Sequence, residues 1–263
     1  MGMTILFVAA NRRAAAAGAI AVSMLAVGAG CAAAPAPAQP PAGPRAAVDS
    51  PAQVARDQLA ARVAAAADQR LTASYVWSAA GRPDRVVTVA EATDGGWRVD
   101  IPGGALDGTV DVAIIRTGAV TFQCTLFSTT EQPTCVRPAD PDGTLPTEAD
   151  PEVHHVFTDW QTTLLDRRAP LAVSVGQPPP GVDGDCFAVG STSASLAAPL
   201  AVGRYCYHPD GTLTGARLDL GTLRLAGPPT AGPATIELPG PVVLGEPLPV
   251  GAPAASTTAP LAD

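Results

Sequence analysis

Five short segments between residues 71 and 126 alternate apolar and polar residues. In the first, Leu71, Ala73, Tyr75 and Trp77 are apolar and most of the residues between them are polar. A period of two residues is that of a half-buried β-strand. Tight turns separate the segments, and successive strands joined in this way predict an antiparallel meander. The four later strands are expected at 85–92, 97–101, 110–116 and 119–126.

Two segments instead have a helical period. Ser50 and Gln53 form a capping box with Pro51 at the first helical position, which predicts a helix to Gln69. Asp150 is expected to cap a second helix, which Pro170 ends. Its apolar face comprises Val153, Val156, Phe157, Trp160 and Leu164. Further strands are expected at 171–175, 186–189, 203–208, 216–220 and 223–226. The fold class is therefore α+β, with a largely antiparallel sheet of about 9 to 11 strands and two main helices.

The N-terminal segment carries an export pattern. Arg12 and Arg13 precede an apolar run, and small residues then lead to Gly30 and Cys31. This arrangement resembles the lipobox of bacterial lipoproteins, in which the cysteine is lipidated and becomes the mature N-terminus. Gly28 departs from it, because the family prefers an aliphatic residue there. An uncleaved membrane helix and plain secretion remain alternatives.

Composition and charge define the remaining organisation. We expect a signal peptide at 1–30, lipidated Cys31 with a Pro- and Ala-rich spacer at 31–48, one domain at 49–240 and a disordered tail at 241–263. The net charge is −8 and every basic residue is Arg, which indicates a GC-rich, actinobacterial-type genome. An acidic chain without a basic stripe argues against nucleic acid and against electrostatic docking to anionic lipid. Membrane attachment therefore depends on Cys31.

Four more cysteines suit an oxidising compartment. An even number in an exported chain predicts disulfides, and four cysteines allow three pairings. Locality favours Cys124 with Cys135 and Cys186 with Cys206. No metal site is expected, because short cysteine pairs are absent from the sequence. The histidines are His154, His155 and His208, and Asp140 and Asp142 fit a solvated turn better than a calcium loop.

Catalytic motifs are absent from the sequence. There is no G-x-S-x-G elbow, no H-E-x-x-H motif, no P-loop and no dinucleotide-binding fingerprint. Glutamate is scarce and aromatic residues make up only 4% of the chain, whereas sugar-binding clefts are usually rich in them. We therefore expect no enzymatic activity and no cofactor.

Four stretches carry a family resemblance: SYVWSA (74–79), DGGWRVDI (94–101), AIIRTGAV (113–120) and VHHVFTDWQTTLL (153–165). With the lipobox and the order of elements, the chain resembles the periplasmic lipoprotein-carrier proteins and the related mycobacterial lipoproteins. The resemblance implies a curved half-barrel sheet with helices on its concave side and an apolar cavity between them. Candidate lining residues are Trp77, Trp97, Phe157 and Trp160, which could equally fill a closed core.

Two functions follow from these patterns. The first is a monomeric, exported lipoprotein, anchored to the outer face of the membrane by lipid on Cys31, that binds a lipid or acyl chain in its cavity. The alternative is a non-catalytic accessory or protein-interaction module of the cell envelope with a solid core.

Overall fold

The computed structural model describes residues 50–129, 131–138, 144–193 and 199–251. The signal segment, the spacer, Cys31, Asp140 and Asp142 lie outside these residues. No helix of the described chain is long and apolar enough to cross a membrane. The helical elements are α1 (Pro51–Ala67), η1 (Leu106–Gly108), η2 (Thr147–Ala149), η3 (Val153–Phe157) and α2 (Asp159–Leu165).

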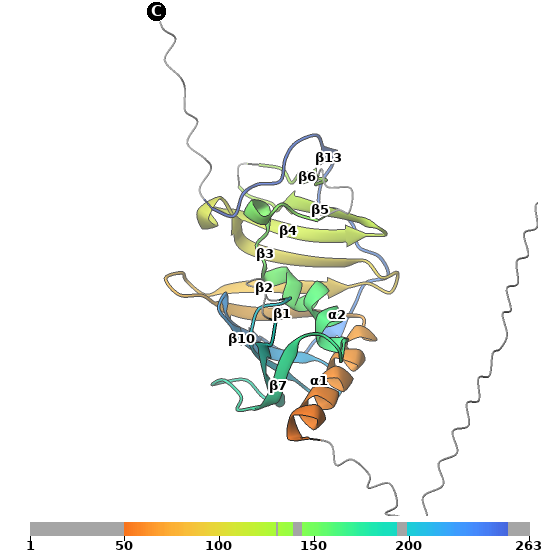
Figure 1. Ribbon diagram of the computed structural model, residues 1–263. Helices are drawn as coiled ribbons and strands as arrows, with labels where there is room; N and C mark the ends of the chain where they lie inside the picture. The colour runs from red at the N-terminus through yellow and green to blue at the C-terminus, as the bar shows by residue number, and fades with distance from the viewer. Residues whose placement is uncertain (1–49, 130, 139–143, 194–198, 252–263) are drawn as a thin grey trace, which may run out of the picture. The chain divides into compact units, whose positions relative to one another are not determined.

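The strands form one open, curved sheet (Figure 1). Its order is β13-β6-β5-β4-β3-β2-β1-β11-β10-β9-β8-β7, with β12 also paired to β1. Every pairing is antiparallel except β13 with β6. The strands are β1 (Leu71–Ser78), β2 (Arg85–Glu91), β3 (Trp97–Ala105), β4 (Val110–Thr117), β5 (Val120–Thr125), β6 (Cys135–Val136), β7 (Leu171–Gly176), β8 (Asp185–Ser191), β9 (Gly203–Tyr207), β10 (Leu213–Leu218), β11 (Gly221–Leu225), β12 (Thr230–Ala231) and β13 (Val242–Val243).

The predicted α+β class is confirmed. The described chain has 13 strands rather than 9 to 11, and the additional pairings include the two-residue strands β6, β12 and β13. Such short strands carry no readable alternation. The β1–β11 pairing joins the meander β1–β6 to the meander β7–β11, so both belong to one sheet.

The helix α1 begins as its sequence predicts. Ser50 Oγ accepts a hydrogen bond from the Gln53 backbone N–H at 3.2 Å, and Pro51 occupies the first turn. The Gln53 side chain donates to Asp57 instead of returning to the cap. Leu59 and Val63 are buried in the main core, and α1 packs on β7 and α2. Burying each such side chain contributes about 1.5–3 kcal/mol.

The main core lies on the face of the sheet that α1 and η3 cover. Alternate residues of β2, β3 and β4 point into it, as the period of two predicts. A second cluster on the opposite face of β4 and β5 contains Ala113 and Ile115, which Ile236 and Leu238 cover. This end of the sheet is therefore buried on both faces. The alternate core residues are Val87, Val89, Val99, Ile101, Val112 and Ile114.

The second helix differs from its prediction, because it is broken at Thr158. Its first part, η3, is a 3₁₀ helix, and only Asp159–Leu165 is α-helical. Asp150 is not a helix cap. Its Oδ1 accepts from the backbone N–H of Glu152 at 2.8 Å, and Glu152 adopts a left-handed φ of 51°. A helix cannot start through that conformation, so it starts after Glu152.

The expected disordered tail is wrong for residues 241–251, while 252–263 lie outside the described residues. Val242 and Val243 pair with β6. Beyond them, Val250 N–H donates to the Glu148 carbonyl at 2.7 Å, and Leu106 N–H donates to the Pro249 carbonyl at 2.8 Å. The composition of this segment suggests disorder, but β6, η1 and η2 form hydrogen bonds with its backbone.

Both disulfides join neighbouring strands. Cys124 of β5 is bonded to Cys135 of β6, and Cys186 of β8 is bonded to Cys206 of β9. In each case the two residues lie directly opposite in the antiparallel register. Locality therefore predicts the pairing that the fold contains, and such bonds are typical of exported chains.

Candidate functional site

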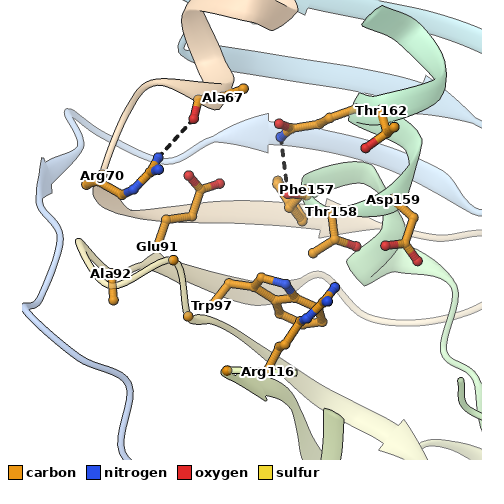
Figure 2. A pocket seen from close by; sticks show the side chains of 14 residues that line it. Ala67, Arg70, Glu91, Ala92, Trp97, Arg116, Phe157, Thr158, Asp159 and Thr162 are labelled. Carbon is orange, nitrogen blue, oxygen red and sulfur yellow. Dashed lines mark hydrogen bonds between the residues drawn. The ribbon is translucent and has the colours of Figure 1, made fainter. Parts of the chain in front are cut away.

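A polar hollow of about 360 Å³ opens where the end of α1, the β2–β3 hairpin and α2 meet. Figure 2 shows Arg70 and Glu91 on one side of it and Asp159 on the other, with Trp97 and Arg116 between them. Two arginines and two carboxylates therefore surround one indole ring.

Strand register brings three of these residues together. Glu91 at the end of β2 lies opposite Trp97 at the start of β3, which in turn lies opposite Arg116 of β4. Directly opposite residues project from the same face of a sheet. The hairpin between β2 and β3 is set by Asp94, whose Oδ1 accepts from the Gly96 N–H at 2.8 Å. The short turn thus places a carboxylate, an indole and a guanidinium side by side.

The carboxyl group of Glu91, which borders this hollow, has a raised pKa. Burial raises its pKa to about 7, although the positive charge of Arg70 opposes the shift. Arg70 is held by a 2.9 Å hydrogen bond from Nη1 to the Ala67 carbonyl, at the end of α1 (Figure 2). The net charge of the hollow therefore changes near neutral pH.

On the other side of Trp97 lies a cluster of two histidines and two aspartates. The Trp97 and His154 rings stack at 6.1 Å between centroids, and the His154 and His155 rings are 4.0 Å apart. Asp150 Oδ2 lies 2.7 Å from His155 Nε2, and Asp159 Oδ2 lies 3.1 Å from His155 Nδ1. A smaller hollow of about 140 Å³ adjoins this cluster and shares Trp97, Arg116 and Asp159 with the larger one.

The pKa values of the two histidines are shifted in opposite directions. Burial and the neighbouring His155 lower the pKa of His154 to about 4. Burial would also lower the pKa of His155, but its hydrogen bonds to Asp150 and Asp159 outweigh burial and raise the pKa to about 9. The hydrogen bond from His155 lowers the pKa of Asp159. Burial would raise the pKa of Asp150, but the hydrogen bond from His155 outweighs burial and lowers it. At neutral pH His155 is thus a cation between two carboxylates.

The four aromatic residues proposed to line an apolar cavity do not share one hollow in the described chain. Phe157 is only 6% exposed and packs on Tyr75 at 4.8 Å between ring centroids, within the core. Trp77 Nε1 donates to the Leu220 carbonyl at 2.9 Å. Trp160 borders a separate hollow that includes Leu220, whereas Trp97 and Phe157 border the polar one.

Several residues of this site escape sequence reasoning. His154 is not part of the apolar face predicted for the second helix, but it is buried. The spacing of Asp150 with His154 and of His155 with Asp159, four residues each, is the signal that could have marked the cluster. No comparable signal marks Glu91 or Arg70, since the hollow depends on strand register.

Comparison with known proteins assigns no family to this chain. No protein-family model matches it, and no curated protein matches it in sequence. Among solved structures, it is similar to a chain of the MucA/MucB complex of Pseudomonas aeruginosa, with 14% identity and a TM-score of 0.37. The match covers 69% of this chain and 59% of that one, less than two thirds of the neighbour. A likeness of this size carries no functional argument, and the lipoprotein-carrier resemblance stays a prediction.

Proposed function

We propose that this chain is an exported, lipid-anchored, non-catalytic binding module of the cell envelope, which binds a polar peptide segment of another envelope protein. The observation that carries the proposal is the polar hollow around Trp97. Its volume of about 360 Å³ falls in the range of ligand sites.

The chemistry of the hollow suits a polypeptide segment. Arg70 and Arg116 offer donors for carboxylates and backbone carbonyls, while Glu91 and Asp159 accept from cationic or amide groups. Trp97 adds a flat apolar face, and tryptophan and arginine are enriched among the residues that dominate protein interfaces. A peptide presents all three kinds of partner at once.

An acyl chain suits the described core less well. It needs an apolar space between sheet and helices, and Phe157 packs against Tyr75 there. The polar lining of the hollow would leave several charged groups without water or partners beneath an acyl chain, which is costly. Lipid binding is therefore the alternative function, which detection of a bound lipid would support.

The anchor is proposed on separate grounds. The pattern before Cys31 resembles a lipobox, and a lysine-free chain with a net charge of −8 has little electrostatic attraction to anionic lipid. Two acyl groups on one cysteine anchor a protein stably. Cys31→Ser should move the protein from the membrane fraction to the soluble fraction. Retention in the membrane would favour an uncleaved helix.

Site-specific photo-crosslinking in the native host tests the binding site. A photoreactive residue replaces Thr162, which is exposed at the rim of the hollow, or Val86, which is half exposed on the opposite face of β2. We expect a discrete crosslinked protein at Thr162 that is absent at Val86 and lost when Arg116→Ala is added. Equal products at both positions, or none at Thr162, would contradict the proposal. A lipid released from the purified chain and detected by native mass spectrometry would favour the acyl-chain function.

A further inference from the structure

We propose that Asp150, His154 and His155 bind a single divalent transition-metal ion of the zinc class, with Asp159 positioning His155. The site adjoins the peptide-binding hollow and shares Asp159 with it, but its donor atoms belong to Asp150, His154 and His155, so the proposal does not depend on peptide binding. It uses none of the cysteines, which are all engaged in disulfides apart from Cys31.

The donor atoms are already gathered. One donor atom from each of the three residues lies within 4.8 Å of the others. Asp150 Oδ1 is 3.5 Å from His154 Nδ1, and Asp150 Oδ2 is 2.7 Å from His155 Nε2. Zinc–nitrogen and zinc–oxygen bonds of about 2.0–2.2 Å place tetrahedral ligands about 3.3–3.6 Å apart. The Asp150–His154 separation already has this value.

His154 supplies the second, independent observation. Its side chain is almost fully buried, with 4% of the residue exposed, and Nδ1 has no hydrogen-bond partner among the described residues. A buried polar atom without a hydrogen-bond partner destabilises a fold. Nδ1 faces the Asp150 carboxylate at a distance too long for a hydrogen bond and suitable for two ligands of one ion. A cation between them would satisfy this atom.

Asp159 is not a proposed metal ligand, but it contacts the second ring nitrogen of His155. Its Oδ2 lies 3.1 Å from His155 Nδ1 and accepts a hydrogen bond from it, which orients the ring with Nε2 toward Asp150. Metal-binding histidines usually donate their second ring N–H to a carboxylate or carbonyl in this way. An ion at Nε2 would replace the proton that Asp150 and His155 share across 2.7 Å.

The donor set indicates the type of ion. Two imidazoles and one carboxylate favour zinc and its transition-metal neighbours over calcium or magnesium, which prefer oxygen ligands. Three protein ligands leave one position of a four-coordinate ion for water or another ligand. The adjoining hollow of about 140 Å³ is bordered by Arg116 and Thr121, whose side chains could contact that ligand.

Titration of the chelator-treated, disulfide-intact chain with Zn²⁺ by calorimetry tests the site, with Co²⁺ as a spectroscopic probe. We expect one Zn²⁺ per chain and Co²⁺ absorption typical of tetrahedral nitrogen and oxygen ligands. His155→Ala should weaken binding at least 100-fold. Asp159→Asn should weaken it about 10- to 100-fold, as expected for a residue that positions a ligand. His208→Ala, which removes the histidine outside the cluster, should leave the affinity unchanged.

Folding is monitored alongside affinity, because the cluster is largely buried. Asp150→Asn keeps the size of the side chain and removes its charge, so it provides a second variant if His155→Ala does not fold. Zn²⁺ should raise the melting temperature of the wild type and of His208→Ala, but not of Asp150→Asn. The proposal is overturned if the wild type shows no saturable one-to-one binding, or if folded cluster variants bind Zn²⁺ as tightly as His208→Ala.

Discussion

Gln123 and Leu248 exchange two hydrogen bonds although 125 positions separate them. Gln123 Nε2 donates to the Leu248 carbonyl at 3.0 Å, and the Leu248 N–H donates to Gln123 Oε1 at 2.6 Å. The same Nε2 donates to the Ala149 carbonyl at 3.1 Å. One buried amide of β5 thus holds both the C-terminal segment and η2 against the sheet.

Removing this amide should loosen the C-terminal segment. Gln123→Ala leaves the Leu248 N–H and the carbonyls of Leu248 and Ala149 without their partner, so we expect the free energy of unfolding to fall by about 2–4 kcal/mol. Hydrogen exchange should become faster at Leu248 and Val250, with little change in β2. Gln58→Ala on the exposed side of α1 is the matched control. Unchanged exchange at Leu248 would show that the packing of Ile236 and Leu238 alone holds the segment.

Arg56 connects α1 to the loop between α2 and β7 through carbonyl groups. It is 7% exposed and donates to the carbonyls of Leu171, Asp166 and Ala169 at 2.6–2.7 Å. Arg56→Leu should lower the free energy of unfolding by about 3 kcal/mol, because these carbonyls lose charge-assisted bonds.

The matched control for Arg56 lies on the same helix. Arg62 pairs with Asp185 at 2.8 Å on the surface, where an ion pair contributes at most about 1 kcal/mol. Urea denaturation of Arg56→Leu and Arg62→Leu should therefore show a clear difference in midpoint. Equal midpoints would mean that the free energy lost in desolvating the buried guanidinium cancels the stabilisation from its three hydrogen bonds.

Glu91 should make stability depend on pH. Its pKa is about 7 in the folded protein and about 4.5 in its ordinary state, so folding favours the protonated form. The resulting stabilisation is fully present below about pH 4.5 and is lost as the pH rises through 7. Glu91→Gln cannot ionise. Relative to wild type, it should gain stability as the pH rises from 4.5 to 8, by at most about 3 kcal/mol.

Thermal or urea unfolding of both proteins across this pH range provides the measurement. The difference curve isolates Glu91, because the other titrating groups are common to the two proteins. Asp94→Asn is not a suitable control, since Asp94 caps the β2–β3 turn. Glu131→Gln, at an exposed loop position, removes a carboxylate away from the hollow and serves as the control. A flat difference curve for Glu91→Gln would show that solvent reaches the Glu91 carboxylate freely.

The two disulfides should each stabilise the domain. Loops of 11 and 20 residues predict roughly 2–4 kcal/mol apiece in the chain-entropy description. Replacing Cys124 and Cys135 together by Ser, or Cys186 and Cys206 together, should lower the melting temperature by several degrees. Peptide mapping without reductant should recover only these two crosslinked pairs. Free thiols at the four positions, or a Cys135–Cys186 peptide, would refute the pairing.

Sequence patterns correctly predicted the elements that form between residues close together in the chain. The alternation around Val87 and Val89 identifies β2 and its buried face, and the turn at Gly95 identifies the hairpin to β3. The α1 cap at Ser50 is also visible in the sequence. The second helix is different, because the apolar period at Val153 and Val156 does not reveal the break at Thr158. There the Asp150 side chain competes with the helix for the Glu152 backbone.

The sequence alone determined the class of fold, the order of most elements and the pairing of neighbouring cysteines, because each depends on residues close together in the chain. Only the tertiary structure decided that β1 lies beside β11, that residues 241–251 pack on the sheet, and that Glu91, Trp97 and Arg116 meet at one hollow. These contacts join distant segments through backbone hydrogen bonds and strand register. Almost any residue can form backbone hydrogen bonds, so no local pattern of side chains predicts these contacts.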